Sequence, residues 1–321
     1  MFSKILGAAL AVFAILGAGS ASASKPTQMS IATGVDPSYA AFYLAQTEGL
    51  FEKNGLKVDL RTGPSGSTMV GFLVKNAVQA AFGAEQAGML NFMLDPDVVV
   101  AAEGTEVREL YGIVAKGVDS IDGLKGKKIG VSPGTGSEVF WLSAIKKLGL
   151  NAEDYRVVQV EAPEMIAALE RGDIDAFSSW EPWVTRATMS IKGAKKILPQ
   201  EGILDSRVFV YLNKGWAEKH PDAAVRFIRS LNEANELIAA QPDYAVDKVS
   251  KFLRLDRALT AKLMDQYSYG LKLTDASISN LKLVADQLQE AGKLAKPVDW
   301  ETFVYATPLR AAAPNAVTYT P

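Results

Sequence analysis

The chain alternates short apolar runs with longer segments in which apolar residues recur every three or four positions. The first run, 29–35, ends at a Gly-Val-Asp-Pro turn, a helical pattern follows to about residue 53, and a second run covers 56–60. Apolar runs that flank an amphipathic helical segment predict a β-α-β unit and a parallel sheet.

The same alternation continues along most of the chain. Further strands are expected at 78–82, 98–102, 110–115, 129–132, 156–160, 174–178 and 208–212. Beyond the last of these the pattern predicts helices alone, over 223–240, 244–253, 258–269 and 276–291. Several strands are followed directly by small polar loops. Open parallel sheets bind ligands at the carboxyl ends of their strands, so these loops are where we expect a binding site.

The first 24 residues have the pattern of a cleaved export signal. Lys4 precedes an apolar run from Ile5 to Leu16, and Ala21-Ser22-Ala23 has the A-x-A form of a cleavage site. The run is too short to span the ~30 Å hydrocarbon core of a membrane comfortably. We therefore expect a mature chain that is exported to a Gram-negative periplasm.

Composition narrows the possible chemistry. The 321 residues are 48% hydrophobic and 22% charged, which is typical of a globular protein. The formal net charge is -2, so the sequence shows no excess of basic residues of the kind that binds nucleic acid. The sequence contains no cysteine, which excludes disulfides, thiol catalysis, Cys-based metal sites and a lipid-modified cysteine anchor. Nothing in the sequence calls for a cofactor or a metal.

Three segments carry a family resemblance. They are Tyr39–Ala45 with Glu48–Leu56, Leu124–Val131, and Asp173–Phe177 with Trp180-Glu181-Pro182. Together they resemble the substrate-binding proteins of ABC importers in the nitrate/sulfonate/taurine group, which overlaps the superfamily of thiamine-pyrimidine-precursor proteins. The match covers residues 29–212.

The resemblance implies an α/β, two-lobed periplasmic-binding-protein type II fold, with mixed, mainly parallel sheets and a hinged cleft. One lobe would comprise 25–115 and 207–321, and the other 116–206, after a signal peptide at 1–24. A small molecule would bind in the cleft as the lobes close. An ABC permease in the inner membrane would receive it, and the protein would be a monomer.

The strand-to-helix loops supply the candidate ligand contacts. In the first lobe they are Asp36, Ser38, Tyr39, Ser65, Gly66, Ser67, Glu85 and Gln86, and in the second they are Ser132, Thr135, Gly136, Ser137, Trp180 and Glu181. The Gly-x-Gly-Ser turn at 134–137 opens a helix, where free backbone N–H groups attract anions. Trp180 offers a flat wall to an apolar or cationic group. Glu181 is either an acceptor for a ligand amine or a carboxylate stabilised at a helix start.

The charges of this set leave two ligand classes open. It contains carboxylates but no arginine or lysine, which disfavours a bare inorganic anion such as nitrate or sulfate. An aminosulfonate such as taurine would place its anionic group on the 134–137 turn and its ammonium near Glu181. A nitrogen heterocycle or a small amine suits Trp180 and Glu181 equally well.

Two other function classes compete with transport. The pyrimidine synthases of the same superfamily consume a histidine of their own, but the one histidine here, His220, precedes a proline at a helix start and lies outside the candidate loops. A sensory protein that docks on a receptor would share both lobes. We expect a non-enzymatic binding protein that takes no cofactor and binds no nucleic acid.

Overall fold

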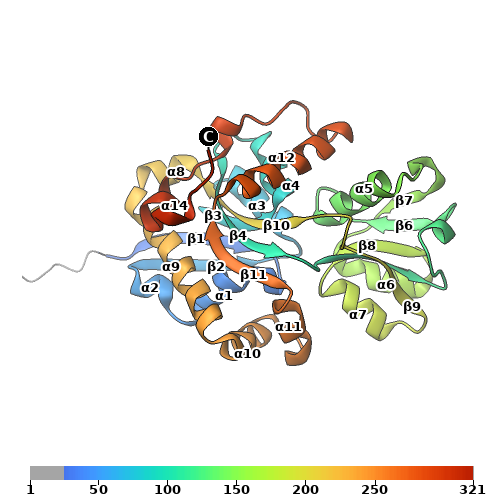
Figure 1. Cartoon of the computed structure of the whole chain (residues 1–321). Helices are drawn as coiled ribbons and strands as arrows, with labels where there is room; N and C mark the ends of the chain where they lie inside the picture. The colour runs from blue at the N-terminus through green and yellow to red at the C-terminus, as the bar shows by residue number, and fades with distance from the viewer. Residues whose placement is uncertain (1–24, 321) are drawn as a thin grey trace, which may run out of the picture.

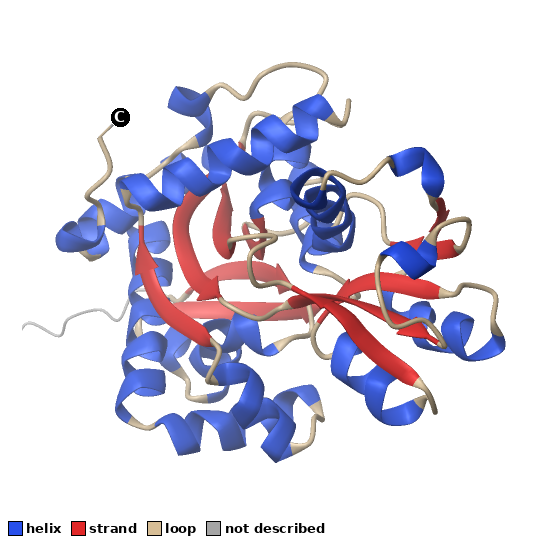
Figure 2. Ribbon diagram, turned by 45° about the vertical axis from the view of Figure 1, so that its right-hand side comes forward, coloured by secondary structure: helices blue, strands red, loops and turns tan. Residues whose placement is uncertain are grey.

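The computed structural model describes residues 25–320, and the expected signal peptide at 1–24 lies outside them. The described residues form two α/β lobes, each built on its own mixed sheet (Figure 1). Helices flank both sheets (Figure 2). The prediction of an α/β protein with two mixed sheets is confirmed.

The first sheet has six strands. In spatial order they are β11 (Tyr267–Lys272), β4 (Val98–Val107), β10 (Ser206–Asn213), β3 (Ala80–Ala84), β1 (Thr27–Thr33) and β2 (Leu56–Thr62). β1 pairs in parallel with β2 and β3, whereas β10 runs antiparallel to β3 and β4. The apolar start of β4, 98–102, is completely buried, as expected for a strand covered on both faces.

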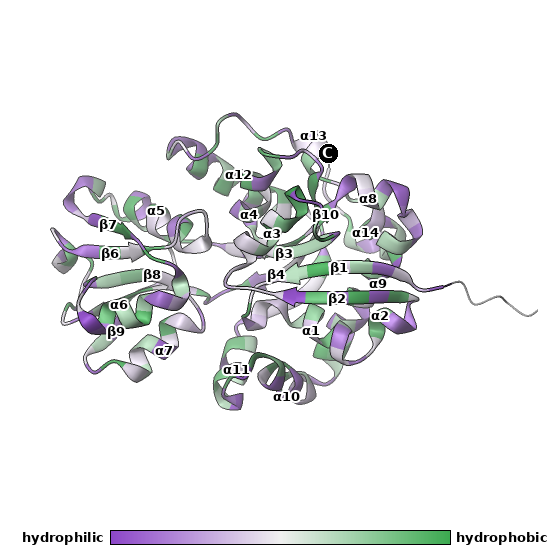
Figure 3. Cartoon of the chain, turned by 180° about the vertical axis from the view of Figure 1, so that it is seen from behind, coloured by the Kyte–Doolittle hydropathy of each residue, from purple (hydrophilic) through white to green (hydrophobic). Residues whose placement is uncertain are grey.

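Helices from both ends of the chain cover this sheet. They are α1 (Ala40–Thr47), α2 (Leu50–Lys53), α3 (Gly66–Val74), α4 (Glu85–Phe92), α8 (Lys214–Lys219), α9 (Pro221–Ala240), α10 (Pro242–Leu253), α11 (Arg257–Met264), α12 (Asp275–Glu290), α13 (Trp300–Phe303) and α14 (Thr307–Ala312). Phe42 of α1 stacks on Phe82 of β3 and meets Phe227 of α9 edge-on, which joins helices distant in sequence on one face of the sheet. Hydrophobic and hydrophilic segments alternate along the edge strand β2 (Figure 3).

The second sheet has five strands and forms the smaller lobe. They lie in the order β7 (Arg156–Gln159), β6 (Lys128–Val131), β8 (Ala176–Trp180), β5 (Tyr111–Lys116) and β9 (Ala194–Pro199). Their helices are α5 (Gly136–Leu148), α6 (Met165–Arg171) and α7 (Trp183–Ser190). Short 3-10 helices complete the chain: η1 (Pro37–Tyr39), η2 (Asp122–Leu124), η3 (Ala152–Asp154), η4 (Ala162–Glu164) and η5 (Pro314–Ala316).

Three expectations from the sequence were wrong. The sheets are mixed but not mainly parallel, because five of their nine strand pairings are antiparallel. The strand expected to end the first lobe at Ala115 is β5, which pairs with β8 and β9 of the second sheet, so the chain crosses between lobes before Tyr111. The helix expected over 258–269 ends at Met264, and the strand β11 begins at Tyr267. β4 extends to Val107, beyond its apolar run. Its outer edge pairs with the segment that begins at Tyr267, and this segment therefore forms the strand β11 instead of continuing the helix.

Two short segments, 108–110 and 200–205, therefore connect the sheets. No helix in residues 25–320 combines the length and apolarity needed to cross a membrane.

Candidate ligand-binding cavity between the lobes

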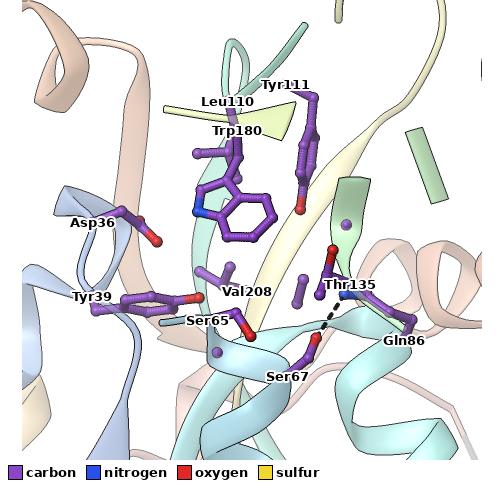
Figure 4. Close-up of a pocket in the computed structure, with 13 residues that line it drawn as sticks. Asp36, Tyr39, Ser65, Ser67, Gln86, Leu110, Tyr111, Thr135, Trp180 and Val208 are labelled. Atoms are coloured by element: carbon purple, nitrogen blue, oxygen red, sulfur yellow. Dashed lines mark hydrogen bonds between the residues drawn. The ribbon is translucent and has the colours of Figure 1, made fainter. Parts of the chain in front are cut away.

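A cavity lies where the two lobes meet, at the starts of helices α3 and α5 (Figure 4). It is lined by Asp36, Tyr39, Ser65, Gly66, Ser67, Ala84, Gln86, Leu110, Tyr111, Thr135, Gly136, Trp180 and Val208. Its volume is about 20 Å³, which holds about one water molecule. A ligand larger than water therefore needs the lobes to stand farther apart than they do here, both to enter and to be held.

The first lobe contributes the N-terminus of α3. The Ser65 hydroxyl caps the helix by accepting from the Thr68 N–H at 3.1 Å. The next residue is Gly66, and a Cβ there would meet the Tyr39 hydroxyl and the backbone of Gly83. Glycine lets the tyrosine lie directly against the first turn of the helix.

The second lobe repeats this construction with α5. The Thr135 hydroxyl accepts from the Ser137 N–H at 3.2 Å and donates to the Ser132 carbonyl at 2.8 Å. A Cβ on Gly136 would collide with the Tyr111 hydroxyl. Each lobe therefore presents a capped helix start, a glycine and a tyrosine to the same space.

This arrangement favours a negatively charged guest. A helix N-terminus carries partial positive charge and unpaired N–H groups, and here two of them face one cavity. Among residues 25–320, no lysine or arginine lines it. Gln86 adds an amide whose Nε2 donates to the Ser67 hydroxyl at 3.2 Å. The cavity thus offers neutral hydrogen-bond donors rather than a cation.

Aromatic and aliphatic side chains form the rest of the wall. Trp180 ends β8 and pairs in register with Tyr111, the first residue of the antiparallel strand β5, so both rings enter the cavity from one edge of the sheet. Burial raises the pKa of Tyr39 and of Tyr111 well above the usual value, which keeps both hydroxyls protonated. Leu110 and Val208 complete the apolar surface.

Asp36 is the acidic residue of the lining. It lies before η1, where its carboxylate accepts from the Ser38 N–H at 2.9 Å and from the Ser38 hydroxyl. Burial raises its pKa to about 7, although these hydrogen bonds lower it. In Figure 4 the carboxyl group points toward the nitrogen-bearing edge of Trp180. Asp36 therefore changes charge near neutral pH inside a site that otherwise favours an anion.

The structure brings most of the predicted contacts together and leaves some outside. Around the cavity lie Asp36, Tyr39, Ser65, Gly66, Ser67, Gln86, Thr135, Gly136 and Trp180. Outside its lining lie Ser38, Glu85, Ser132, Ser137 and Glu181, all of them buried.

The serines outside the lining hold the site in place. Ser38 anchors Asp36, and its carbonyl accepts from the Thr105 hydroxyl at 2.9 Å. The Ser137 hydroxyl accepts from the Ser132 N–H at 3.0 Å and donates to the Ser178 carbonyl at 2.6 Å. Ser178 returns a hydrogen bond to the Ser137 carbonyl at 2.8 Å, which fixes the start of α5 against β8.

Glu85 and Glu181 lie outside the lining, and their carboxyl groups accept hydrogen bonds from other residues of the protein. A carboxyl oxygen of Glu85 accepts from the Arg207 N–H at 2.6 Å, and burial raises the pKa of Glu85 to about 8. The carboxyl group of Glu181 accepts from the N–H and the hydroxyl of Thr185, at 2.9 and 3.0 Å, in the first turn of α7. Of its two suggested roles, the structure gives Glu181 that of a carboxylate at a helix start.

Sequence reasoning missed Ala84, Leu110, Tyr111 and Val208. The prediction was limited to loops that follow strands, whereas Tyr111 begins a strand. Because β5 runs antiparallel to β8, its start lies at the edge where β8 ends. Val208 reaches the cavity in the same way, since β10 is antiparallel to β3 and pairs Val208 with Ala84.

Comparisons with known proteins agree with this architecture. The family described as NMT1/THI5 like matches residues 36–245. A putative aliphatic sulfonates-binding protein of Bacillus subtilis is 28% identical, over 81% of this chain and 80% of its own length. The taurine-binding periplasmic protein of Escherichia coli is 29% identical, over 66% of this chain and 68% of its own.

A similar solved structure is the periplasmic aliphatic sulphonate binding protein of Escherichia coli. It superposes with a TM-score of 0.75 at 18% identity, and the alignment covers 87% of this chain and 98% of that one. This likeness shows that the fold is that of periplasmic binding proteins, as the sequence predicted. Since the family match spans more than half of the chain, the protein belongs to the NMT1/THI5-like family.

Proposed function

We propose that this protein is the solute-binding component of an ABC importer and that it captures a small organic sulfonate between its lobes. The observation that carries the proposal is the pair of helix starts, α3 and α5, that face one cavity, whose lining in the described part of the chain contains no lysine or arginine. Relatives named for sulfonate and taurine binding support the same ligand class.

A sulfonate suits these donors because it spreads one negative charge over three oxygens. A helix N-terminus stabilises an anion by about 0.3–1 kcal/mol when exposed and up to about 2 kcal/mol in a partly buried geometry. The protonated hydroxyls of Tyr39 and Tyr111 lie beside the two helix starts and add further donors. Leu110, Val208 and the indole of Trp180 provide an apolar surface for the carbon chain.

Asp36 favours a ligand that also carries an amino group. An ionised carboxylate beside a bound sulfonate repels it, whereas a ligand ammonium placed between the two offsets that repulsion. We therefore propose an aminosulfonate such as taurine as the preferred ligand. The second candidate, a nitrogen heterocycle, is favoured by the proximity of Asp36 and Trp180, but it would leave both helix starts without an anion.

Binding without turnover is part of the proposal. His220 is exposed at the start of α9, outside the lining of the cavity. The titratable side chains of the cavity are Asp36 and the two tyrosines, and the tyrosines stay protonated. We propose that the mature chain acts in a periplasm, binds as a monomer and passes its ligand to a membrane permease.

Calorimetric titration of the purified mature chain tests this function. Taurine, ethanesulfonate and 4-aminopyrimidine separate the requirement for a sulfonate from the requirement for a nitrogen. We expect tight binding of taurine, weaker binding of ethanesulfonate, and no chemical change in either ligand. Binding of the pyrimidine alone would replace the proposed ligand class, and consumption of a ligand would replace the proposed role.

A further inference from the structure

The side chain of Gln200 lies between the two segments that connect the lobes, 108–110 and 200–205, which we call the hinge segments. It is 2% exposed. Gln200 follows β9 of the second sheet directly, and the chain reaches β10 of the first sheet at Ser206. This buried amide therefore lies within one hinge segment, where the chain passes between lobes.

Its hydrogen bonds all go to the backbone of the other hinge segment and its ends. The Gln200 Oε1 accepts from the N–H groups of Leu110 and Tyr111 at 2.8 and 3.0 Å. Its Nε2 donates to the Val107 carbonyl at 2.9 Å. Val107 is the last residue of β4 in the first sheet, and Tyr111 is the first residue of β5 in the second. One side chain thus bonds to the ends of both sheets.

This bonding is sensitive to the angle between the lobes. A rotation of one lobe on the other changes the backbone torsions in 108–110, which lie between the Val107 carbonyl and the Tyr111 N–H. Hydrogen bonds weaken steeply once donor and acceptor separate or tilt, and a rigid planar amide cannot follow both ends. Gln200 follows β9, which pairs with β5, so its bonds to Leu110 and Tyr111 stay with the second lobe, and the bond to the Val107 carbonyl is the one that a turn of the lobes strains.

The bonds also act on the cavity itself. Leu110 and Tyr111 line it, and Gln200 binds both through their N–H groups. The Leu110 carbonyl accepts from the Glu181 N–H at 2.8 Å, next to Trp180. Gln200 thus holds the strand that carries part of the apolar wall, without lining the cavity.

We infer that Gln200 is a positioning residue that latches the hinge in the arrangement that closes the cavity. Its amide stabilises the closed lobes because all of its bonds are made there, and opening trades them for bonds with water. The part of this inference that concerns affinity rests on the proposed function, whereas the part that concerns the lobe angle does not.

Two substitutions separate the latch from a local structural role. Gln200→Met removes every polar contact at similar volume. Gln200→Glu keeps an acceptor for Leu110 and Tyr111 but loses the donor to Val107, so it cuts the link to the first lobe alone. Gln79→Met is the matched control, because the Gln79 side chain accepts from the Ser30 N–H at 2.7 Å within the first lobe.

The lobe angle is measured by electron spin resonance between two labels. The sequence contains no cysteine, so Met189→Cys and Ala258→Cys give unique attachment points. Both residues are exposed, and they line opposite sides of the groove between α7 of the second lobe and α11 of the first. We expect both Gln200 variants to shift the ligand-free distances to longer values, and Gln79→Met to leave them unchanged.

Taurine binding provides the second readout. Gln200→Met should weaken binding roughly tenfold, mainly through faster dissociation, while taurine at saturation restores the short distance. Wild-type distances and affinity in both Gln200 variants would overturn the inference, as would a shift in Gln200→Met but not in Gln200→Glu. If Gln200→Met fails to fold, Gln200→Glu decides. If the wild type binds no sulfonate, the proposed function fails, and the ligand-free distances still test the latch.

Discussion

The two halves of the cavity share one construction and differ in one charge. On each side a capped helix start is covered by a tyrosine that lies over a glycine, Tyr39 over Gly66 and Tyr111 over Gly136. The first lobe adds the carboxyl group of Asp36, and the second adds the indole of Trp180 but no acidic lining residue. Under the proposed function, the shared construction holds the anion, and the difference selects an anion that also carries an amino group.

The largest expected effect comes from removing that one charge. Asp36→Asn keeps an acceptor for the Ser38 N–H and takes away the carboxylate. Breaking a buried ion pair costs about 2–5 kcal/mol, so taurine should bind roughly a hundredfold more weakly. Ethanesulfonate should bind more tightly to the variant because the repulsion is gone. Calorimetric titration of the wild type and of Asp36→Asn with each ligand measures this opposite change in affinity. Equal losses of affinity for both ligands would contradict the proposed contact between Asp36 and the ligand amino group.

Adding a methyl group to each glycine compares the two helix starts. Gly66 is close to the backbone of Gly83 as well as to Tyr39, so Gly66→Ala should lower stability by about 1–3 kcal/mol. The three heavy atoms nearest to a Cβ at Gly136 all belong to Tyr111, and Gly136→Ala should push that ring into the cavity. Thermal denaturation should show the larger loss for Gly66→Ala, while taurine binding should fall in both variants. Unchanged binding in Gly136→Ala would remove α5 from the site.

The pH dependence of binding sharpens the charge assignment. Asp36 has a pKa of about 7 in the free protein, so it is mostly protonated at pH 6 and ionised at pH 8. Taurine, whose ammonium prefers the carboxylate, should bind about tenfold more tightly at pH 8 than at pH 6, and ethanesulfonate should show the opposite slope.

Asp36→Asn provides the control for these slopes. Glu85, with a pKa of about 8, titrates in the same range, and its contribution should remain in the variant. Parallel slopes for the two ligands in the wild type would show that Asp36 does not contact the amino group.

The smallest effect is expected at Glu181. Its carboxyl group caps the start of α7 by accepting from Thr185, and it lies outside the cavity lining. Glu181→Gln retains an acceptor for the Thr185 N–H, so taurine affinity should stay within about twofold of the wild type, as for a surface or near-neutral change. A large loss in calorimetry would return Glu181 to the site.

The sequence was informative where periodicity and local chemistry decide structure. Apolar runs and helix starts located α3 and α5, and therefore Ser65, Gly66, Thr135 and Gly136. Strand direction is a property of the whole sheet, and nothing local marks β5 as antiparallel to β8. Tyr111 was therefore assigned to the body of a first-lobe strand instead of the cavity.

Glu181 illustrates the same limit for side chains. A carboxylate next to a tryptophan at a strand end suits a ligand as well as it suits a helix start. The choice between them depends on the direction of α7 and on the position of Thr185, which the fold sets. In the same way, the partners of Gln200 lie about 90 residues away along the chain, at Val107, Leu110 and Tyr111.

The most direct measurement is a crystal structure of the mature protein with taurine. The account predicts that the sulfonate oxygens accept hydrogen bonds from the starts of α3 and α5 and that the ammonium lies against Asp36. A ligand bound outside this cavity, or one whose sulfonate avoids both helix starts, would contradict it.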